Sequence, residues 1–333
     1  MHPYSNILVT GGAGFIGSHF IRFLLSTYPH ITVVNVDLLT YCGNLENVKD
    51  VSNDPRYHFR KADIGDLEAM EKILTEFCID CIVNFAAESD NNKAVLSPLD
   101  FVKTNVLGTA TLLSAARKTS VKRFHHISTC EVFGELPLTS PERFVEESPY
   151  RPRTPYNASK ASSDLFVKSY YHTFGLPVTI SYSANNYGTH QFPEKVIPVF
   201  TLKALKNEPL PLFASTGHKR EWIHVLDHSK AIDLILQKGV IGESYNIGTG
   251  FEKTISEIAA DILGILHKPK SMTTIVPDRL GHDSRYLLDS SKVRALGWKP
   301  EIVWEKGLAE TVEWYAKNAQ WWEPLLARSH SWK

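Results

Sequence analysis

Short apolar runs alternate with helix-like segments over the first 185 residues of the chain. Runs of this kind are typical of parallel strands that are buried on both faces of a sheet. They occupy 6–10, 32–36, 57–60, 81–87, 123–128 and 178–182, and apolar residues recur at helical spacing over 66–77, 100–118 and 156–174. The alternation predicts an α/β fold built on a Rossmann-type, doubly wound parallel sheet.

A glycine-rich turn follows the first expected strand. Gly11, Gly14 and Gly17 precede a helical pattern, and a turn of this composition lets the backbone and a helix N-terminus approach a pyrophosphate. Asp37 ends the second strand, 20 residues after Gly17, where a carboxylate binds ribose hydroxyls and repels a 2′-phosphate. The spacing therefore predicts NAD rather than NADP. Further cofactor contacts are expected at Phe15, Ile16, Asp63, Ile64, Ala86 and Ala87.

The strand–helix alternation breaks after about residue 185, where prolines become frequent. Two helical patterns remain, near 226–237 and 254–266. We expect an NAD-binding Rossmann domain at 1–185 that carries the catalytic residues. A smaller α/β lobe at 186–333 should bind the substrate, with some chain crossing back.

Candidate catalytic residues lie at the end of the fifth strand and at the start of the helix that follows. Tyr156 and Lys160 are four residues apart, which places both side chains on one face of a helix. A lysine ammonium in that position should lower the pKa of the phenol, so that Tyr156 can take a proton from a sugar hydroxyl. Thr129 could hold that hydroxyl. Cys130 and Glu131 are additional acid or base groups that a simple alcohol dehydrogenase does not need.

Charge and cysteine usage exclude several classes of protein. Lys+Arg and Asp+Glu number 36 each, which argues against a nucleic-acid binder that relies on bulk charge. There is no apolar run near 18 residues and no signal peptide, so we expect a cytoplasmic protein without a membrane segment. The Cys78 and Cys81 pair is interpreted as buried structural cysteines, and no metal site is expected.

With these motifs in place, the sequence resembles the extended short-chain dehydrogenase/reductases. Within them it is similar to the nucleotide-sugar 4,6-dehydratases, most closely to the dTDP-glucose type, along nearly the whole chain. The matching blocks are 33–41, 43–45, 85–89, 104–109, 128–132, 185–188, 191–198, 220–222, 227–228 and 281–286.

The resemblance implies a catalytic cycle with tightly bound NAD. Tyr156, helped by Lys160 and Thr129, oxidises C4 of a nucleotide-linked hexose, and the hydride passes to NAD⁺. Glu131 then removes the C5 proton that the new ketone has acidified, water leaves C6, and the hydride returns to C6. The product is a 4-keto-6-deoxy sugar, and NAD is regenerated in each cycle.

The resemblance also implies further binding residues and a homodimer. Asn105 is expected near the cofactor. Substrate contacts are expected at Ser89, Asn91, Asn92, Asn185, Asn186, Glu194, Lys195, Arg220, Asn246 and Arg279. Among them, Asn186, Lys195, Arg220 and Arg279 are expected to hold the nucleotide diphosphate, because Arg and Lys suit that group. In the superfamily, helices equivalent to 100–118 and 156–174 pair across a two-fold axis into a four-helix bundle.

Two segments depart from the family pattern. Cys130 stands where the dTDP-glucose enzymes carry an Asp, their acid for the C6 hydroxyl. A thiol with an ordinary pKa of about 8.5 is a weaker acid. The second departure is the segment from Asp90 to Lys93, where the family usually has His-Val-Asp-Arg after Glu-Ser. Asn91 and Asn92 could bind an acetamido group, so UDP-GlcNAc is placed ahead of dTDP-glucose and UDP-glucose as the substrate.

Several alternatives remain open. A 5,6-dehydratase would return the hydride to C4, and the Asp-to-Cys change is compatible with it. A 4-epimerase needs only Thr129, Tyr156 and Lys160. A decarboxylase acting on a nucleotide uronic acid needs an extra cation such as Lys93. Outside enzymes, the chain could be an NAD(H)-sensing scaffold, although the complete set of catalytic residues weighs against that.

Overall fold

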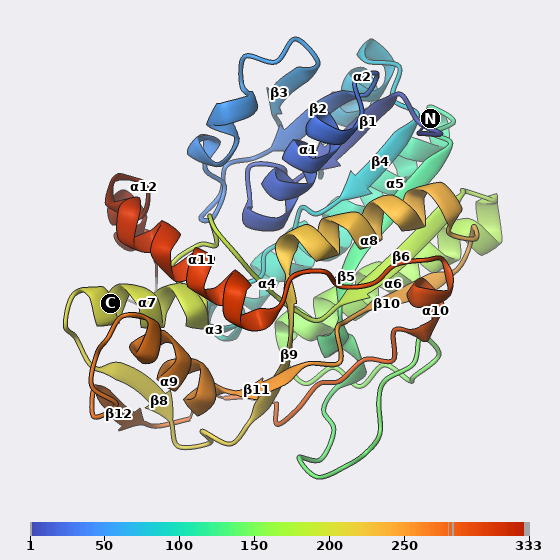
Figure 1. The fold of residues 1–333 in the computed structure, drawn as a ribbon. Coiled ribbons are helices and arrows are strands. Elements are labelled where there is room, and N and C mark those ends of the chain that lie inside the picture. The colour runs from blue at the N-terminus through green and yellow to red at the C-terminus, as the bar shows by residue number, and fades with distance from the viewer. Residues whose placement is uncertain (1, 279, 282, 330–333) are drawn as a thin grey trace.

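The computed structural model describes residues 2–278, 280–281 and 283–329. Its centre is a seven-stranded sheet in which every neighbouring pair of strands is parallel. The strand order is β10-β6-β5-β4-β1-β2-β3, so the order reverses between β1 and β4 (Figure 1). The strands are β1 (Asn6–Thr10), β2 (Thr32–Asp37), β3 (Tyr57–Lys61), β4 (Cys81–Asn84), β5 (Arg123–Thr129), β6 (Val178–Ser183) and β10 (Ser244–Ile247). The α/β doubly wound fold expected from the sequence is confirmed.

Helices cover both faces of this sheet. On one face α1 packs against α8, and on the other α5 packs against α2 and α6 (Figure 1). The bounds are α1 (Phe15–Thr27), α2 (Leu67–Glu76), α5 (Thr109–Lys118), α6 (Pro155–Phe174) and α8 (Val225–Lys238). Local signals define α6: Thr154 caps its start by accepting a hydrogen bond from the Asn157 N–H, and Gly175 ends it in the left-handed conformation at φ 68°.

A smaller lobe lies beside the carboxyl ends of the sheet. It holds a three-stranded sheet in the order β11-β9-β7 and a parallel pair, β12 and β8, with its own apolar core. Its elements are β7 (Asn185–Tyr187), α7 (Val196–Leu205), β8 (Leu210–Phe213), β9 (Lys219–His224), β11 (Glu252–Thr254), α9 (Ile255–Ile265), β12 (Thr273–Val276), α11 (Trp304–Lys317) and α12 (Ala319–Leu326). Between these segments, α8, β10 and α10 (Ser291–Ala295) return to the main sheet (Figure 1).

The helical pattern at 100–118 is not a single regular helix. Its segments are α4 (Pro98–Phe101), a π-helical turn η2 (Val102–Gly108) and α5, and a short helix α3 (Asn91–Leu96) precedes them. A π turn inserts one extra residue per hydrogen-bonded ring and commonly occurs near functional sites. Here it turns buried Asn105 inward, where its side chain holds both backbone groups of Glu88.

Two short 3₁₀ segments complete the chain, η1 (Leu45–Val51) and η3 (Cys130–Phe133).

One detail of the cysteine prediction is wrong: Cys81 is buried on β4, but Cys78 is exposed in a turn with φ 49°. Within the described residues, no helix is long and apolar enough to cross a membrane. The same part of the chain contains no group of three or more His, Cys, Asp or Glu side chains arranged to hold a metal ion.

Candidate active site

One cavity of about 640 Å³ lies between the carboxyl ends of the sheet strands and the smaller lobe. This is the position at which open α/β sheets bind ligands. It brings together most residues that the sequence singled out: Gly11, Gly14, Phe15, Ile16, Gly17, Asp37, Asp63, Ile64, Ala86, Ala87, Ser89, Asn91, Asn92, Thr129, Cys130, Glu131, Tyr156, Lys160, Asn185, Asn186, Glu194, Lys195 and Arg220.

The glycine loop is shaped for close backbone approach. Gly11 has φ 66°, and a Cβ on it would lie 2.8 Å from the Ala86 nitrogen. A Cβ on Gly17 would lie 2.5 Å from the Gly11 carbonyl oxygen. Gly14 caps α1 without any side-chain hydrogen bond, which leaves the N–H groups of the first turn available to an anion. The loop therefore fits a dinucleotide pyrophosphate.

Asp37 lies at the carboxyl end of β2, on the wall of the same cavity. Its carboxylate accepts hydrogen bonds from the backbone N–H groups of Ala13, at 3.0 Å, and Leu39, at 2.8 Å. These bonds tie the glycine loop to the end of β2 and fix the carboxylate in place. The carboxylate can accept hydrogen bonds from the ribose hydroxyls of NAD, and an anion here repels a 2′-phosphate.

Tyr156 and Thr129 form the expected pair at the centre of the cavity. Thr129 is buried and Tyr156 is partly buried, and their hydroxyl groups are hydrogen-bonded to each other. Lys160 lies one turn further along α6 and is also buried. Its ammonium donates to the Ile127 carbonyl at 2.7 Å and lies 3.3 Å from Nε2 of His126.

The expected fall in the pKa of Tyr156 is not observed. Burial, followed by the neighbouring Glu131 and Cys130, raises the pKa of the phenol above its usual range. Lys160 points its charge at a carbonyl instead, and burial lowers its own pKa to about 8. Bound NAD⁺ supplies a hydride acceptor and a positive charge, which act in the direction that favours loss of a proton from Tyr156.

Cys130 and Glu131 begin the 3₁₀ turn η3 directly after β5. Thr129 caps this turn by accepting a hydrogen bond from the Glu131 N–H at 3.3 Å. Burial, with a further contribution from Glu131, raises the pKa of the Cys130 thiol well above its usual range. The thiol is therefore neutral at physiological pH and is a weaker acid than a free cysteine.

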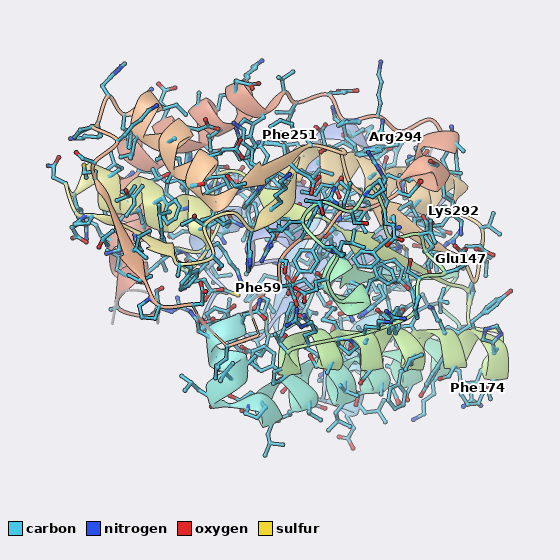
Figure 2. The ribbon with its side chains drawn as sticks, turned by 90° about the horizontal axis from the view of Figure 1, so that it is seen from below. Phe59, Glu147, Phe174, Phe251, Lys292 and Arg294 are labelled. Carbon is cyan, nitrogen blue, oxygen red and sulfur yellow. The ribbon has the colours of Figure 1, made fainter. Side chains whose placement is uncertain are left out.

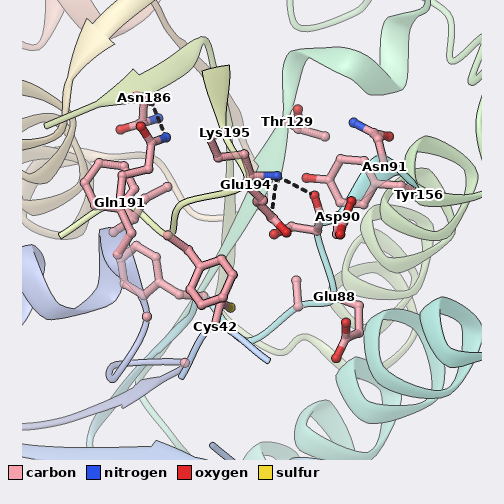
Figure 3. Close-up of a pocket in the computed structure, with 18 of the residues that line it drawn as sticks. Cys42, Glu88, Asp90, Asn91, Thr129, Tyr156, Asn186, Gln191, Glu194 and Lys195 are labelled. Carbon is pink, nitrogen blue, oxygen red and sulfur yellow. Dashed lines mark hydrogen bonds and ion pairs between the residues drawn. The ribbon is translucent and has the colours of Figure 1, made fainter. Parts of the chain in front are cut away.

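A charged cluster occupies another wall of the cavity (Figure 3). The Lys195 ammonium lies 3.0 Å from the Glu194 carboxylate and donates to the Ser89 carbonyl at 2.8 Å. The Tyr41 hydroxyl donates to Glu194 at 3.0 Å. Asp90, which is buried, lies within hydrogen-bonding reach of Glu194. Burial raises the pKa of Glu194 to about 7; Lys195 opposes that rise and Asp90 adds to it.

Arg220, on β9, presents a fixed positive charge on the lobe side of the cavity. Its guanidinium donates to the backbone carbonyls of Lys219, Asp283 and Ser284, and lies 4.8 Å from the centre of the Tyr286 ring. The carbonyls hold the cation without neutralising it. This arrangement fits a diphosphate.

Some predicted contacts are not brought to the cavity. Asn246 lies in β10, a strand of the main sheet, and its side chain donates to the Phe144 carbonyl at 2.8 Å. It therefore does not line the cavity. Asn105 does not line the cavity; it positions Glu88 from behind. Asn186 lines the cavity, but its amide bonds Ser183, Ala184 and His228. The expected Arg279 lies outside the described residues.

Several lining residues were not predicted as site residues. Aromatic, thiol and carboxyl groups among them are Tyr41, Cys42, Glu88, Asp90, Phe192, Trp222 and Tyr286. Tyr41 and Glu88 stand within blocks that resemble the family, and that position could have identified them. Asp90 carried a signal as well, since it begins the segment that departs from the family pattern. Phe192 and Trp222 also stand within such blocks, although their aromatic character alone is equally typical of core residues.

Comparisons with known proteins agree with this geometry. The family model described as GDP-mannose 4,6 dehydratase matches residues 8–311. The dTDP-glucose 4,6-dehydratase of Haemophilus influenzae is 44% identical, over 94% of this chain and 98% of that protein. The enzyme of the same name from Neisseria meningitidis is 42% identical, over 97% of both chains.

Solved structures give the same result. The dTDP-glucose 4,6-dehydratase of Streptomyces venezuelae, crystallised with NAD, superposes with a TM-score of 0.93 at 45% identity, covering 96% of this chain and 99% of that one. A UDP-glucose 4-epimerase from Thermotoga maritima gives 0.86 at 32% identity, covering 94% and 99%. The chain therefore belongs to the NAD-dependent nucleotide-sugar 4,6-dehydratases, lyases of the extended short-chain dehydrogenase/reductase fold.

Proposed function

We propose that the substrate of this 4,6-dehydratase is dTDP-glucose. The observation that carries the proposal is the similarity over almost the full length to enzymes named for that substrate, at 42–44% identity for the two relatives described above. Arg220, Lys195 and Asn185 line the cavity on the lobe side, where a nucleoside diphosphate can be held. The earlier preference for UDP-GlcNAc thereby becomes the second candidate.

UDP-GlcNAc is kept because of the segment that begins at Asp90. Asn91 and Asn92 both line the cavity, and amide groups suit a 2-acetamido substituent. Asn91 makes only a 3.4 Å contact from the Thr154 hydroxyl to its Oδ1 atom, so its NH₂ group has no bond to a protein atom among the described contacts. This observation supports a sugar that differs from glucose at C2.

The residues take their roles from their positions. Tyr156 and Thr129 are placed to bind the C4 hydroxyl and take its proton, while Lys160 lies beneath them. Glu131, two residues after Thr129, is the base for the C5 proton. Loss of that proton makes the chain a dehydratase rather than an epimerase, because an epimerase needs no base at C5.

The remaining alternatives are less well supported. Lys93 turns away from the sugar to pair with Glu88 at 3.0 Å and Asp100 at 3.4 Å, so it offers no cation to a uronic acid carboxylate. A 5,6-dehydratase differs only in where the hydride returns, and product analysis separates the two reactions. A scaffold without activity would not need Thr129, Tyr156 and Lys160 together in the cavity.

We also propose a homodimer formed by α4, η2 and α6. This face exposes large apolar side chains, which a monomer rarely leaves in one patch. They are Leu99, Val102, Leu107, Leu165 and Phe166, with exposed fractions of 42–78%. Figure 2 shows α6 along one side of the molecule, ending near Phe174. A second copy of the same face would cover the patch across a two-fold axis.

Incubation of the purified holoenzyme with dTDP-glucose and, separately, with UDP-GlcNAc tests the substrate. We expect a 4-keto-6-deoxy product, identified by mass spectrometry and NMR, from dTDP-glucose. Turnover of UDP-GlcNAc with none of dTDP-glucose would reverse the order of the two candidates. Turnover of neither would reject both.

A further inference from the structure

Elimination of water requires a proton donor at C6, and the cavity does not hold the family's donor. Cys130 occupies that position. Burial raises the pKa of its thiol, so the thiol is a weaker acid than usual. In the segment after Glu88-Ser89, the family pattern His-Val-Asp-Arg has its carboxyl group at the position of Asn92, whereas this chain carries it at Asp90. Both positions line the same cavity.

Asp90 and Glu194 form a buried carboxyl pair. The side chain of Glu194 is 3% exposed, and Asp90 is equally buried. Oδ1 of Asp90 accepts the N–H groups of Asn92, at 2.8 Å, and Lys93, at 3.3 Å, which caps α3 and fixes the side chain. Among the described residues, Oδ2 of Asp90 accepts no hydrogen bond. A proton on Glu194 would supply one, since the two groups lie within hydrogen-bonding reach.

We propose that the Asp90–Glu194 pair shares one proton and is the general acid that protonates the C6 hydroxyl in this enzyme. Two carboxyl groups this close resist ionising together and share one proton, as in aspartic protease dyads, and burial moves the loss of that proton toward neutral pH. The pair then takes over the task that an aspartate performs at the position of Cys130 in the family. The inference rests on the 4,6-dehydratase activity and not on the identity of the sugar.

The surrounding charges support this role. Burial and the contact with Asp90 raise the pKa of Glu194 to about 7, which is close to working pH. Lys195 interacts with Glu194, with Asp90 and with the base Glu131, so all three carboxyl groups border one region of the cavity. Tyr41 and Cys42 are further titratable groups that interact with Glu194, and Glu88 interacts with both of them.

The protons balance over one turnover. Glu131 takes the C5 proton, the C6–O bond breaks, and the pair gives its proton to the departing hydroxyl, which leaves as water. The hydride that left C4 is then delivered to C6, and the C5 proton returns from Glu131. In each turnover Tyr156 gains one proton from the C4 hydroxyl and the pair loses one. The two changes cancel when the pair is reprotonated, so no outside acid is consumed.

Asp90→Asn tests the proposal by separating oxidation from elimination. We expect C4 oxidation to persist, measured as NADH absorbance in the holoenzyme, while water loss slows roughly 100-fold, the lower limit of general acid catalysis. NADH should therefore accumulate. Without its anionic neighbour, Glu194 should ionise at lower pH, so the basic limb of the elimination profile should move to lower pH. Asp100→Asn is the matched control, because Asp100 pairs with Lys93 at a more exposed site.

Restoring the family acid provides the complementary test. Cys130→Asp in the Asp90→Asn background should recover elimination, whereas Cys130→Ser should not. Glu194→Gln should reproduce the loss if Asp90→Asn fails to fold. The proposal is overturned if Asp90→Asn and Glu194→Gln eliminate water at the wild-type rate. A loss of oxidation and elimination in equal proportion would also overturn it, since that result indicates only a binding role. The assay uses whichever sugar the wild type oxidises, and a wild type that oxidises neither sugar indicates a wrong substrate, not a wrong acid.

Discussion

Tyr156 is the residue on which C4 oxidation depends. Its hydroxyl is hydrogen-bonded to Thr129 at the centre of the cavity. Tyr156→Phe removes the group that takes the C4 proton but keeps the ring and its packing against Phe101. We expect kcat to fall by about 10³-fold, within the range for loss of a general base, while the NAD content of the purified protein is unchanged. Rapid-quench assays and cofactor extraction measure both quantities, and a variant with normal turnover would exclude the assigned role.

Sequence reasoning succeeded for residues that belong to a spaced motif. The glycines, Asp37 and the Tyr156–Lys160 pair are fixed by their distances along one strand–turn–helix unit, so their meeting in space follows from the local fold. It failed where the tertiary environment decides. The pKa of Tyr156 depends on burial and on the carbonyl that captures Lys160, and neither can be read from spacing.

The glycine turn between β1 and α1 is the element on which cofactor binding depends. Gly17→Ala would place a Cβ 2.5 Å from the Gly11 carbonyl oxygen, so the turn must move. We expect the protein to be purified with less than about a tenth of its NAD, because the loop can no longer approach the pyrophosphate. Absorbance and cofactor extraction measure the loss.

Gly264→Ala in α9 is the control for that change. Nothing lies within 4 Å of a Cβ at Gly264, and the residue is helical. We expect normal NAD content and a gain of about 0.5–1 kcal/mol in the free energy of unfolding, from the higher helix propensity of alanine. If Gly17→Ala retained its NAD as Gly264→Ala does, the account of the turn would be wrong.

The presence of the helices was predictable from the sequence, but irregularities within them were not. The helical periodicity of 156–174 agrees with α6, whose cap residues Thr154 and Gly175 reinforce it. The pattern at 100–118 gave no sign of the π turn η2, because the turn is stabilised by the inward bonds of Asn105 to the segment around Glu88. These long-range contacts have no local signature.

At the scale of the whole molecule, the exposed apolar face predicts self-association. Leu165→Glu would place a charge in the proposed contact on α6, where Leu165 is 57% exposed in the single chain. We expect the dimer dissociation constant to rise at least about 100-fold, because burying an unpaired carboxylate costs several kcal/mol. Sedimentation velocity over a concentration series measures it.

Val303→Glu is the matched control, since Val303 is 64% exposed just before α11, on the smaller lobe. This variant should sediment as the wild type does. A wild-type protein that is monomeric at all concentrations would remove the dimer from the account.

The division of the chain also becomes clear at this scale: α8 and β10 return to the main sheet, and no composition shift in the sequence marks that crossing.

The central claim is tested most directly by the product formed from dTDP-glucose in deuterated water without added NAD. The account predicts loss of one water, a ketone or its hydrate at C4, a methyl group at C6 and deuterium at C5, since Glu131 exchanges its proton with solvent. Turnover under these conditions also requires NAD that stays bound and is regenerated. An alkene between C5 and C6 with an intact C4 hydroxyl, or a simple C4 epimer, would contradict the account.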